Sequence, residues 1–273
     1  MTGIVFSCLV PHPPIIVPDI GRGEERKISA TSNSMEELVQ LLARHRPDSV
    51  IIISPHGNYM NDAMGILTAP SSDGNLNSWG VHGLNLHFEN DLELVELIRK
   101  QCEQKEIPLR SIGKTAYDLD HGVMVPLYFL HRALKGVPLI PITFSWLSLK
   151  THFTFGQSIH KAAADSNKRV AIIASGDLSH RLIPGAPAGY DPAGKVFDEQ
   201  LGKSLSKMDA KGILNYDPSL IEHAGECGLR SVVIMLGALD GLNVIPDILS
   251  YEGPFGVGYM VASFEVKPKS SGS

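Results

Sequence analysis

The chain has 273 residues, of which 43% are hydrophobic and 19% are charged, and its formal net charge is −5 with neutral histidines. This composition provides enough apolar material for the core of one large domain and excludes a disordered chain. An acidic balance without blocks of like charge argues against a nucleic-acid-binding face, so no nucleic-acid partner is expected.

Three features bear on where the chain works. The cysteine count is odd and sparse (Cys8, Cys102 and Cys227), which does not suit a disulfide framework and favours a reducing cytoplasm. The N-terminal segment has no basic region and is interrupted by Pro11 and His12, so a signal peptide is not expected. Apolar runs stay far below the roughly 18–20 residues of a membrane span, so no membrane association is expected.

In the first half of the chain, apolar runs alternate with amphipathic stretches. Ser34 is the predicted N-cap of one helix, because Glu37 three residues later completes a capping box. The β-branched run after it is typical of a buried parallel strand. The predicted elements are a strand at Ile4–Val10, a helix at Ser34–Arg44, a strand at Ser49–Ile53, a loop at Ser71–Gly83 and a helix at Asp91–Gln104.

The second half continues the alternation. The predicted elements are a helix at Gly122–Leu134, a strand at Leu139–Phe144, a helix at Phe155–Asp165, a strand at Val170–Ala174, a loop at Arg181–Pro192, a helix at Phe197–Met208, a helix at Ser219–Leu239 that is uneven around Gly225 and Gly228, and a strand at Gly256–Val266. This order predicts one α/β domain over residues 1–266, with a central, mostly parallel sheet flanked by helices on both faces. Residues 267–273 are predicted to form a flexible tail.

Histidines follow three of the predicted strands directly. His12 follows Ile4–Val10, His56 follows Ser49–Ile53, and His180 follows Val170–Ala174. In open α/β sheets, ligands bind beyond the carboxyl ends of the strands. The three imidazoles are therefore expected on one rim of the sheet, provided that their strands are central neighbours. For any one of them alone, a turn residue with a backbone hydrogen bond is the alternative.

Two further candidates lie next to predicted helices. His121 precedes a helix and is preceded by Asp120, so it is either an active-site residue or an incidental part of a capping segment. Glu226 lies on a predicted helix between Gly225 and Gly228, which would let other backbone approach closely. An ion pair from Glu226 to Arg230, four residues later, is the alternative to a ligand role.

Five motifs in this order carry a family resemblance: PHPP, SPHG, DLDHG, SGDLSH and AGECGLRS, which begin at residues 11, 54, 118, 175 and 224. Together they resemble the class III extradiol ring-cleavage dioxygenases of the LigB type, and most closely the Memo-like branch found in AmmeMemoRadiSam proteins. The resemblance covers about residues 4 to 265. It implies the LigB/Memo-like α/β fold and a metal-dependent site.

The resemblance implies a role for each candidate. His12 and His56 match the two metal-binding histidines, and Glu226 matches the carboxylate ligand. His180 matches the catalytic acid/base, and His121 matches a second active-site histidine. In the Memo branch a cysteine takes the third metal corner, and Cys227 adjoins Glu226 here. Because adjacent helical residues point about 100° apart, both cannot easily bind one ion, and Glu226 is the expected ligand.

This set of residues predicts an oxygen-dependent reaction. Two imidazoles and one carboxylate with open positions are typical of non-haem Fe(II) oxygenases. The expected activity is extradiol cleavage of a catechol-like or aminophenol-like ring, with both atoms of O2 inserted. His180 would move protons, and Asp177, three residues earlier, would orient its ring. A Memo-like metal-binding accessory protein without ring cleavage and a Zn(II)-dependent hydrolase remain the alternatives.

The same resemblance sets the expected partners. They are a small aromatic substrate and O2, with a C-terminal or separate partner domain in an AmmeMemoRadiSam pathway. A homodimer is compatible with this architecture. The sequence does not identify the substrate.

Overall fold

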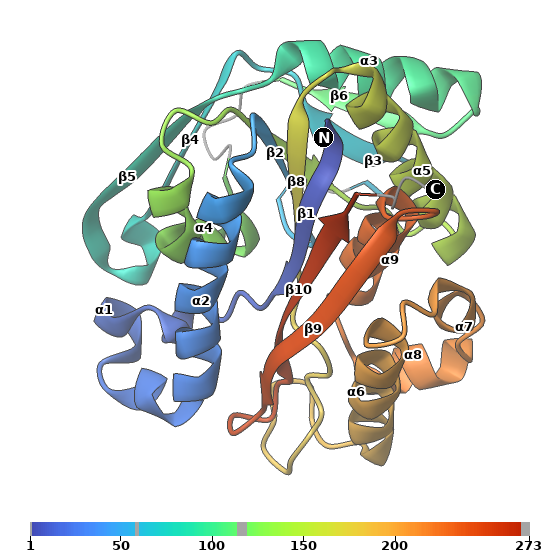
Figure 1. Ribbon diagram of the computed structural model, residues 1–273. Coiled ribbons are helices and arrows are strands. Elements are labelled where there is room, and N and C mark those ends of the chain that lie inside the picture. Colours follow the sequence, from blue (N-terminus) through green and yellow to red (C-terminus); the bar gives the residue numbers. More distant parts are fainter. Residues whose placement is uncertain (1, 58–59, 114–118, 269–273) are drawn as a thin grey trace.

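The computed structural model describes residues 2–57, 60–113 and 119–268 (Figure 1). Of the predicted tail, Lys267 is the last residue of a strand, and residues 269–273 lie outside the described residues. Of the helices that the structure describes, none combines the length and the apolar character needed to cross a membrane.

The main sheet of the described chain has eight strands in the order β6-β3-β7-β2-β8-β1-β10-β9. Their bounds, in that order, are Leu109–Ile112, Met64–Leu67, Leu139–Thr143, Ser49–Ser54, Arg169–Ser175, Gly3–Val10, Tyr259–Lys267 and Asn243–Glu252. The central strands β7, β2, β8 and β1 are parallel to one another. Antiparallel pairing begins where β3 joins β7 and where β10 joins β1. The predicted mostly parallel sheet is therefore confirmed at its centre.

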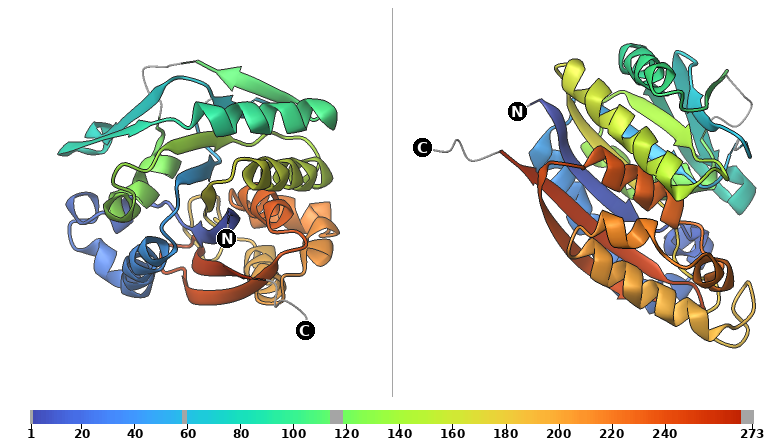
Figure 2. Two further views of the ribbon diagram at one scale, coloured as in Figure 1. Left: turned by 45° about the horizontal axis from the view of Figure 1, so that its top comes forward. Right: turned by 90° about the vertical axis from the view of Figure 1, so that its right-hand side faces the viewer.

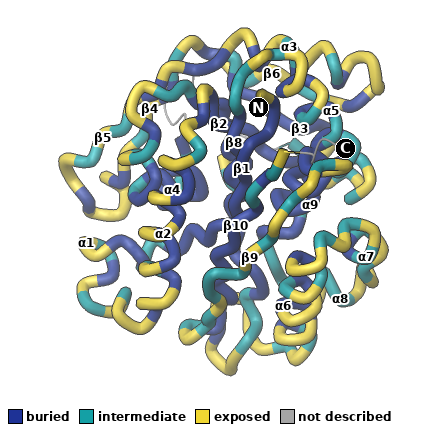
Figure 3. Tube along the Cα trace, viewed as in Figure 1, coloured by how far each residue is buried: buried dark blue, intermediate teal, exposed yellow. Residues whose placement is uncertain are grey.

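Helices cover both faces of this sheet (Figure 2). Their bounds are α1 Pro18–Gly21, α2 Ser29–His45, α3 Leu92–Gln104, α4 His121–Leu130, α5 Leu149–Asp165, α6 Pro192–Leu205, α7 Ala210–Leu214, α8 Pro218–Ala224 and α9 Leu229–Ala238. One apolar cluster joins the sheet to α2 and α4, and a second joins the opposite face to α3, α5, α6 and α9. The strands between the two layers are buried along their length (Figure 3), which explains why their sequences are continuous apolar runs.

Helix α2 begins earlier than the sequence predicts. Helix α2 starts at Ser29, and Ser34 is a buried residue inside it rather than its N-cap. The earlier start has a tertiary cause: Glu252 on β9 accepts hydrogen bonds from both the backbone N–H and the hydroxyl of Thr31, at 2.6 and 2.7 Å. These contacts anchor a turn that local propensity does not favour.

The predicted loop at residues 71–83 is wrong. Strands β4 (Ser71–Leu76) and β5 (Val81–Glu89) pair antiparallel in a second sheet, joined by a 3₁₀ turn at Asn77–Trp79. The polar sequence hides these strands because only Ser72, Leu76, Val81 and Phe88 are buried along them. Pairing and packing against α4 override the weak strand propensity of residues 71–76.

The long helix predicted over residues 219–239 is two helices. Helix α8 ends at Ala224, where Gly225 adopts φ 61°, and α9 begins at Leu229. A positive φ is a conformation that glycine adopts without a steric cost. Residues 225–228 consequently form a turn, and this turn decides which side chain reaches the site.

Candidate metal centre

The topology places the histidine-bearing loops together. Strands β2, β8 and β1 are immediate neighbours in the sheet, so the condition set by the sequence is met. His12 and His56 lie directly beyond the carboxyl ends of β1 and β2, and His180 lies in the loop that follows β8.

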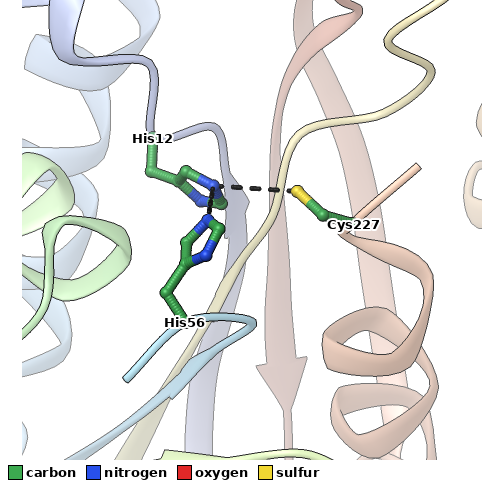
Figure 4. A group of neighbouring side chains, drawn as sticks. All are labelled: His12, His56 and Cys227. Atoms are coloured by element: carbon green, nitrogen blue, oxygen red, sulfur yellow. Dashed lines mark hydrogen bonds between the residues drawn. The ribbon is translucent and has the colours of Figure 1, made fainter. Parts of the chain in front are cut away.

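Three side chains converge on one point. The Nε2 atoms of His12 and His56 are 3.1 Å apart, and the Sγ atom of Cys227 lies 3.7 Å from Nε2 of His12 (Figure 4). Their ligand atoms all lie within 4.8 Å of one another, and the described residues contain no other comparable His/Cys/Asp/Glu group. His12 is buried, while His56 and Cys227 are half-buried.

A buried hydroxyl sets the tautomer of His12. The hydroxyl of Ser175 donates its hydrogen to the carbonyl of Gly122, so at Nδ1 of His12, 3.0 Å away, it acts as the acceptor. Nδ1 of His12 therefore carries the proton, which leaves a lone pair on Nε2, the atom that faces His56 and Cys227. A ring nitrogen fixed in this way by its partner is the usual arrangement of a metal-binding histidine.

Cys227 is held by the loop after β8. Its backbone N–H donates to the carbonyl of Asp177 at 3.3 Å, and its sulfur accepts the backbone N–H of Asp177 at 3.3 Å. The two segments approach closely because glycines face each other: a Cβ on Gly176 would lie 2.2 Å from the Cα of Gly228. The close backbone approach expected at Gly228 is present.

The structure does not bring Glu226, the expected third ligand, to this group. Its carboxylate accepts the backbone N–H of Leu229 at 2.6 Å at the start of α9 and lies 4.0 Å from the guanidinium of Arg230. The prediction assumed a continuous helix, whereas the turn at residues 225–228 directs Cys227 to the histidines and Glu226 to the helix start. In the candidate group, Cys227 therefore lies where Glu226 was expected.

His121 borders the group, as expected. Asp120 caps α4 by accepting the backbone N–H of Gly122 at 2.7 Å, so the capping interpretation holds for this segment, and the active-site role of His121 stays a prediction. The ring centroid of His121 lies 4.1 Å from that of His56 and 5.6 Å from that of His12. Trp79 packs against the outer side of His121, with 5.8 Å between the ring centroids.

The expected hydrogen bond between Asp177 and the ring of His180 is not present. Nδ1 of His180 is buried without a hydrogen-bond partner among the described residues, so the expected contact with Asp177 is not made there. Oδ1 of Asp177 instead accepts the backbone N–H of His12 at 2.8 Å. His180 is anchored through its own backbone N–H, which donates to the carbonyl of Gly225 at 3.3 Å.

Burial keeps the donor atoms uncharged. Burial, the largest cause, and charge repulsion from the neighbouring histidines together lower the pKa of His12 and that of His56 to about 3. Burial also raises the pKa of the Cys227 thiol well above its usual value. Neutral imidazoles are the form that binds metals, and a bound cation favours thiolate over thiol.

The geometry fits one metal ion. With nitrogen ligands at roughly 2.0–2.1 Å and sulfur at roughly 2.3 Å, a tetrahedral ion separates two nitrogens by roughly 3.3 Å and nitrogen from sulfur by roughly 3.6 Å. The separations from Nε2 of His12 are 3.1 Å to His56 and 3.7 Å to Cys227, and the ligand atoms of His56 and Cys227 lie within 4.8 Å of each other. Two imidazoles and one thiol suit zinc or copper, and they depart from the two-histidine, one-carboxylate set typical of Fe(II) oxygenases.

A cavity of about 760 Å³ opens beside His121. It is lined by β4, the Asn77–Trp79 turn, β5 and the start of α4, and it includes Trp79, Asp120 and His121. Aromatic and polar groups converge here next to the candidate metal centre, which is the usual composition of a small-molecule site.

Residues 7–262 match the family model described as the catalytic LigB subunit of aromatic ring-opening dioxygenase. This chain belongs to the LigB family. The matched range includes His12, His56, His121, His180 and Cys227, and the resemblance inferred from the five motifs is confirmed at the level of the family.

Curated relatives of this LigB chain fall into two groups. Protein CA_C1420 of Clostridium acetobutylicum is 38% identical, over 94% of this chain and 56% of its own length. The MEMO1 family protein MJ0403 of Methanocaldococcus jannaschii is 29% identical, over 56% of this chain and 50% of its own length. The chain thus spans about half the length of these two relatives.

The second group consists of named dioxygenases. The 2-aminophenol 1,6-dioxygenase alpha subunit of a Pseudomonas species is 24% identical, over 96% of this chain and 99% of its own length. Among solved structures, protein JW3007 of Escherichia coli K12 has a TM-score of 0.64 and 17% identity over 96% of this chain and 99% of its own. That likeness concerns the fold alone, and it agrees with the α/β architecture expected of the LigB family.

Proposed function

We propose that this chain is a Memo-like metal protein that binds one zinc or copper ion through His12, His56 and Cys227. The observation that carries the proposal is the convergence of the two Nε2 atoms and one Sγ atom, at 3.1 and 3.7 Å. Thiolate is a soft ligand and selects zinc or Cu(I) over Fe(II). The family relationship to MEMO1 proteins is in keeping with it.

In this proposal the chain's own residues prepare the site for the ion. Ser175 accepts a hydrogen bond from Nδ1 of His12, and Asp177 accepts one from its backbone N–H. Nε2 of His12 is therefore oriented toward the other two ligand atoms by the protein itself. Cys227 loses its proton when the ion binds, and a nearby imidazole of His121 or His180 can accept it. The ion itself supplies Lewis acidity, and copper would add one-electron redox chemistry.

A second candidate is ring cleavage by an oxygen-dependent enzyme of the LigB type, acting on a catechol-like or aminophenol-like substrate. What favours it is that His121 and His180 both lie close enough to His12 and His56 to interact with them electrostatically, together with the cavity at Trp79 and His121. The relative named as a 2-aminophenol 1,6-dioxygenase subunit matches this chain over almost its whole length. Here His180 would take the substrate's phenolic proton, and His121 would hold the substrate by a hydrogen bond.

One experiment separates the two candidates. The protein is purified anaerobically, its metal content is measured, and oxygen uptake is followed with a panel of catechols and 2-aminophenols after loading with Zn(II), Cu(I) or Fe(II). The Memo-like proposal expects one zinc or copper per chain and no oxygen uptake coupled to ring opening with any loading.

Variants make the outcome specific. His12→Ala and Cys227→Ser should lose the bound zinc or copper, whereas His180→Ala should keep it. Oxygen uptake with a ring-opened product in the Fe(II)-loaded protein, lost in His180→Ala while the metal stays bound, would overturn the Memo-like proposal in favour of ring cleavage.

A further inference from the structure

A second cavity lies on the other side of the turn that carries Cys227. It has a volume of about 670 Å³ and is formed by the segment between β7 and α5, by α7 and α8, and by the start of α9. Among the described residues it shares no lining residue with the cavity beside His121. Its wall is mainly apolar and includes Trp146, Leu149, Pro218 and Ile221.

Arg230 is the half-buried cation among the residues that line this cavity. Its guanidinium lies 4.4 Å from the ring centroid of Trp146 and 6.0 Å from that of Phe144. Only 17% of its side chain is exposed. Its Nε atom is buried without a hydrogen-bond partner, and no hydrogen bond joins its guanidinium to any described residue.

The neighbouring acid does not satisfy these donors. Oε1 of Glu226 lies 4.0 Å from the nearest guanidinium nitrogen, which is beyond hydrogen-bond distance, and Oε2 accepts the backbone N–H of Leu229. Lys150 and Glu222 also line the cavity, but both are exposed and their charges oppose each other. Arg230 therefore provides a half-buried guanidinium whose donors have no hydrogen-bond partner among the described residues, with Nε fully buried.

Leaving the donors of a half-buried arginine unpaired is costly, since each such group forfeits its water without gaining a partner. A guanidinium presents five N–H donors in a planar fork that matches a carboxylate. Trp146 lies beside the Arg230 guanidinium, and 56% of its surface is exposed, compared with 44% for Trp79. A ligand with one carboxylate and an apolar ring would accept hydrogen bonds from the Arg230 guanidinium and pack against Trp146.

We propose that this cavity is a binding site for a small aromatic carboxylate, with the carboxylate on the Arg230 guanidinium and the ring against Trp146 and the apolar wall. The site is separate from the candidate metal centre and goes beyond the proposed function. It nevertheless adjoins that centre, because Gly225 and Glu226 line the cavity and precede Cys227 directly.

The test uses sodium benzoate as the probe and the metal-loaded protein. Trp79→Phe is used as the background, because the chain has two tryptophans and Trp146 then reports alone. We expect a saturable change of Trp146 fluorescence with benzoate, and at least about tenfold weaker binding in Arg230→Gln, since a charge-assisted pair contributes about 1.5–3 kcal/mol. Benzyl alcohol, which lacks the carboxylate, should bind weakly and equally to both proteins.

Two further variants guard the conclusion. Arg230→Lys keeps the charge without the fork and should bind benzoate with intermediate strength, which covers the case in which Arg230→Gln does not fold. Arg132→Gln is the control: it removes a surface arginine that pairs with Glu36 and lies outside the cavity, and it should bind benzoate like the background protein.

The proposal is overturned if benzoate gives no saturable response up to about 10 mM, about tenfold above a weak Kd of about 1 mM. It is equally overturned if Arg230→Gln and Arg230→Lys bind benzoate as tightly as the background protein. Binding that is unaffected by these variants but disappears with a chelator would place benzoate on the metal instead. None of these outcomes depends on which reaction or metal the first site uses.

Discussion

Oδ1 of Asp177 accepts the backbone N–H of His12 at 2.8 Å, across 165 positions of sequence. The contact ties the loop after β8 to the loop after β1, and the same residue uses its own backbone N–H and carbonyl to hold Cys227. Asp177 thus fixes the spacing between two of the three candidate ligands. Burial raises the pKa of its carboxyl to about 6, so this position carries an energetic cost that its hydrogen bonds partly offset.

Asp177→Ala should weaken zinc binding about 10- to 100-fold, because residues that orient a metal ligand typically have effects of this size. Asp177→Asn keeps a carbonyl oxygen that can accept the His12 N–H and should lose much less. Competition against a chromophoric chelator measures both affinities. Equal affinities for Asp177→Ala and the wild type would show that His12 is aimed without this contact.

Cys227 and Glu226 make opposite predictions although they are neighbours in sequence. Cys227→Ser should lower the affinity for zinc or Cu(I) at least about tenfold, because a hydroxyl is a poor substitute for a soft thiolate. Glu226→Gln keeps an oxygen that can accept the N–H of Leu229 and should leave the metal affinity within about threefold of the wild type. Metal titrations of the two variants, done side by side, decide between them. The reverse ranking would assign the third corner to Glu226 after all.

The contact between Gly176 and Gly228 makes a prediction about stability. A Cβ on Gly176 would lie 2.2 Å from the Cα of Gly228, which is backbone that cannot move aside as a flexible side chain could. Gly176→Ala should therefore separate the turn that carries Cys227 from the loop after β8, at a cost of about 1–3 kcal/mol in the free energy of unfolding. It should also weaken zinc binding.

Gly185→Ala is the control for metal affinity, because nothing lies within 4 Å of the added Cβ, while its φ of 85° gives it a stability cost of its own. Urea unfolding and metal titration of both variants measure the effects. Metal affinity that falls in Gly185→Ala as much as in Gly176→Ala would show that the loss is not specific to the Gly176–Gly228 contact.

The sequence predicts the histidine side of this site well. Apolar runs mark β1, β2 and β8 as buried strands, and parallel strands end on one rim, so the sequence alone predicts that His12, His56 and His180 lie on the same rim. The cap at Asp120 was also readable, since aspartate before a helix is a local signal. These features depend on contacts between neighbours in sequence or on a general rule of topology.

The rest depended on contacts that a single sequence does not reveal. Strands β3, β6 and β9 were missed because the first two are short and β9 is a half-exposed edge strand that contains Pro246. The choice between Glu226 and Cys227 turned on whether residues 225–228 continue a helix, and that was decided by the approach of Gly228 to Gly176, about 50 residues earlier in the chain. The carboxylate of Asp177 likewise accepts a hydrogen bond from His12, 165 positions earlier, rather than from the ring of His180, three residues later. Such a long-range contact is also not readable from one sequence.

A buried histidine outside the metal centre predicts how stability depends on pH. Nδ1 of His152 donates to the carbonyl of Ser148 at 2.8 Å, and Nε2 accepts the backbone N–H of Ser145 at 3.3 Å, so the ring must be neutral. Burial lowers its pKa to about 4 from an ordinary value of 6.5. The unfolded chain therefore takes up a proton below pH 6.5 that the folded chain does not bind until about pH 4, and stability falls as the pH falls through that window.

Removing this group should flatten the profile. His152→Gln should lose stability at pH 7 because of its altered packing and hydrogen bonds, but its free energy of unfolding should fall less between pH 6.5 and pH 4 than that of the wild type. The difference is at most about 3 kcal/mol, from 1.36 kcal/mol for each pKa unit. Thr151→Ala alters a neighbour that does not titrate and should keep the wild-type profile. Urea unfolding at several pH values tests this, and parallel profiles for His152→Gln and the wild type would mean that His152 accepts its proton in the folded protein as readily as in the unfolded chain.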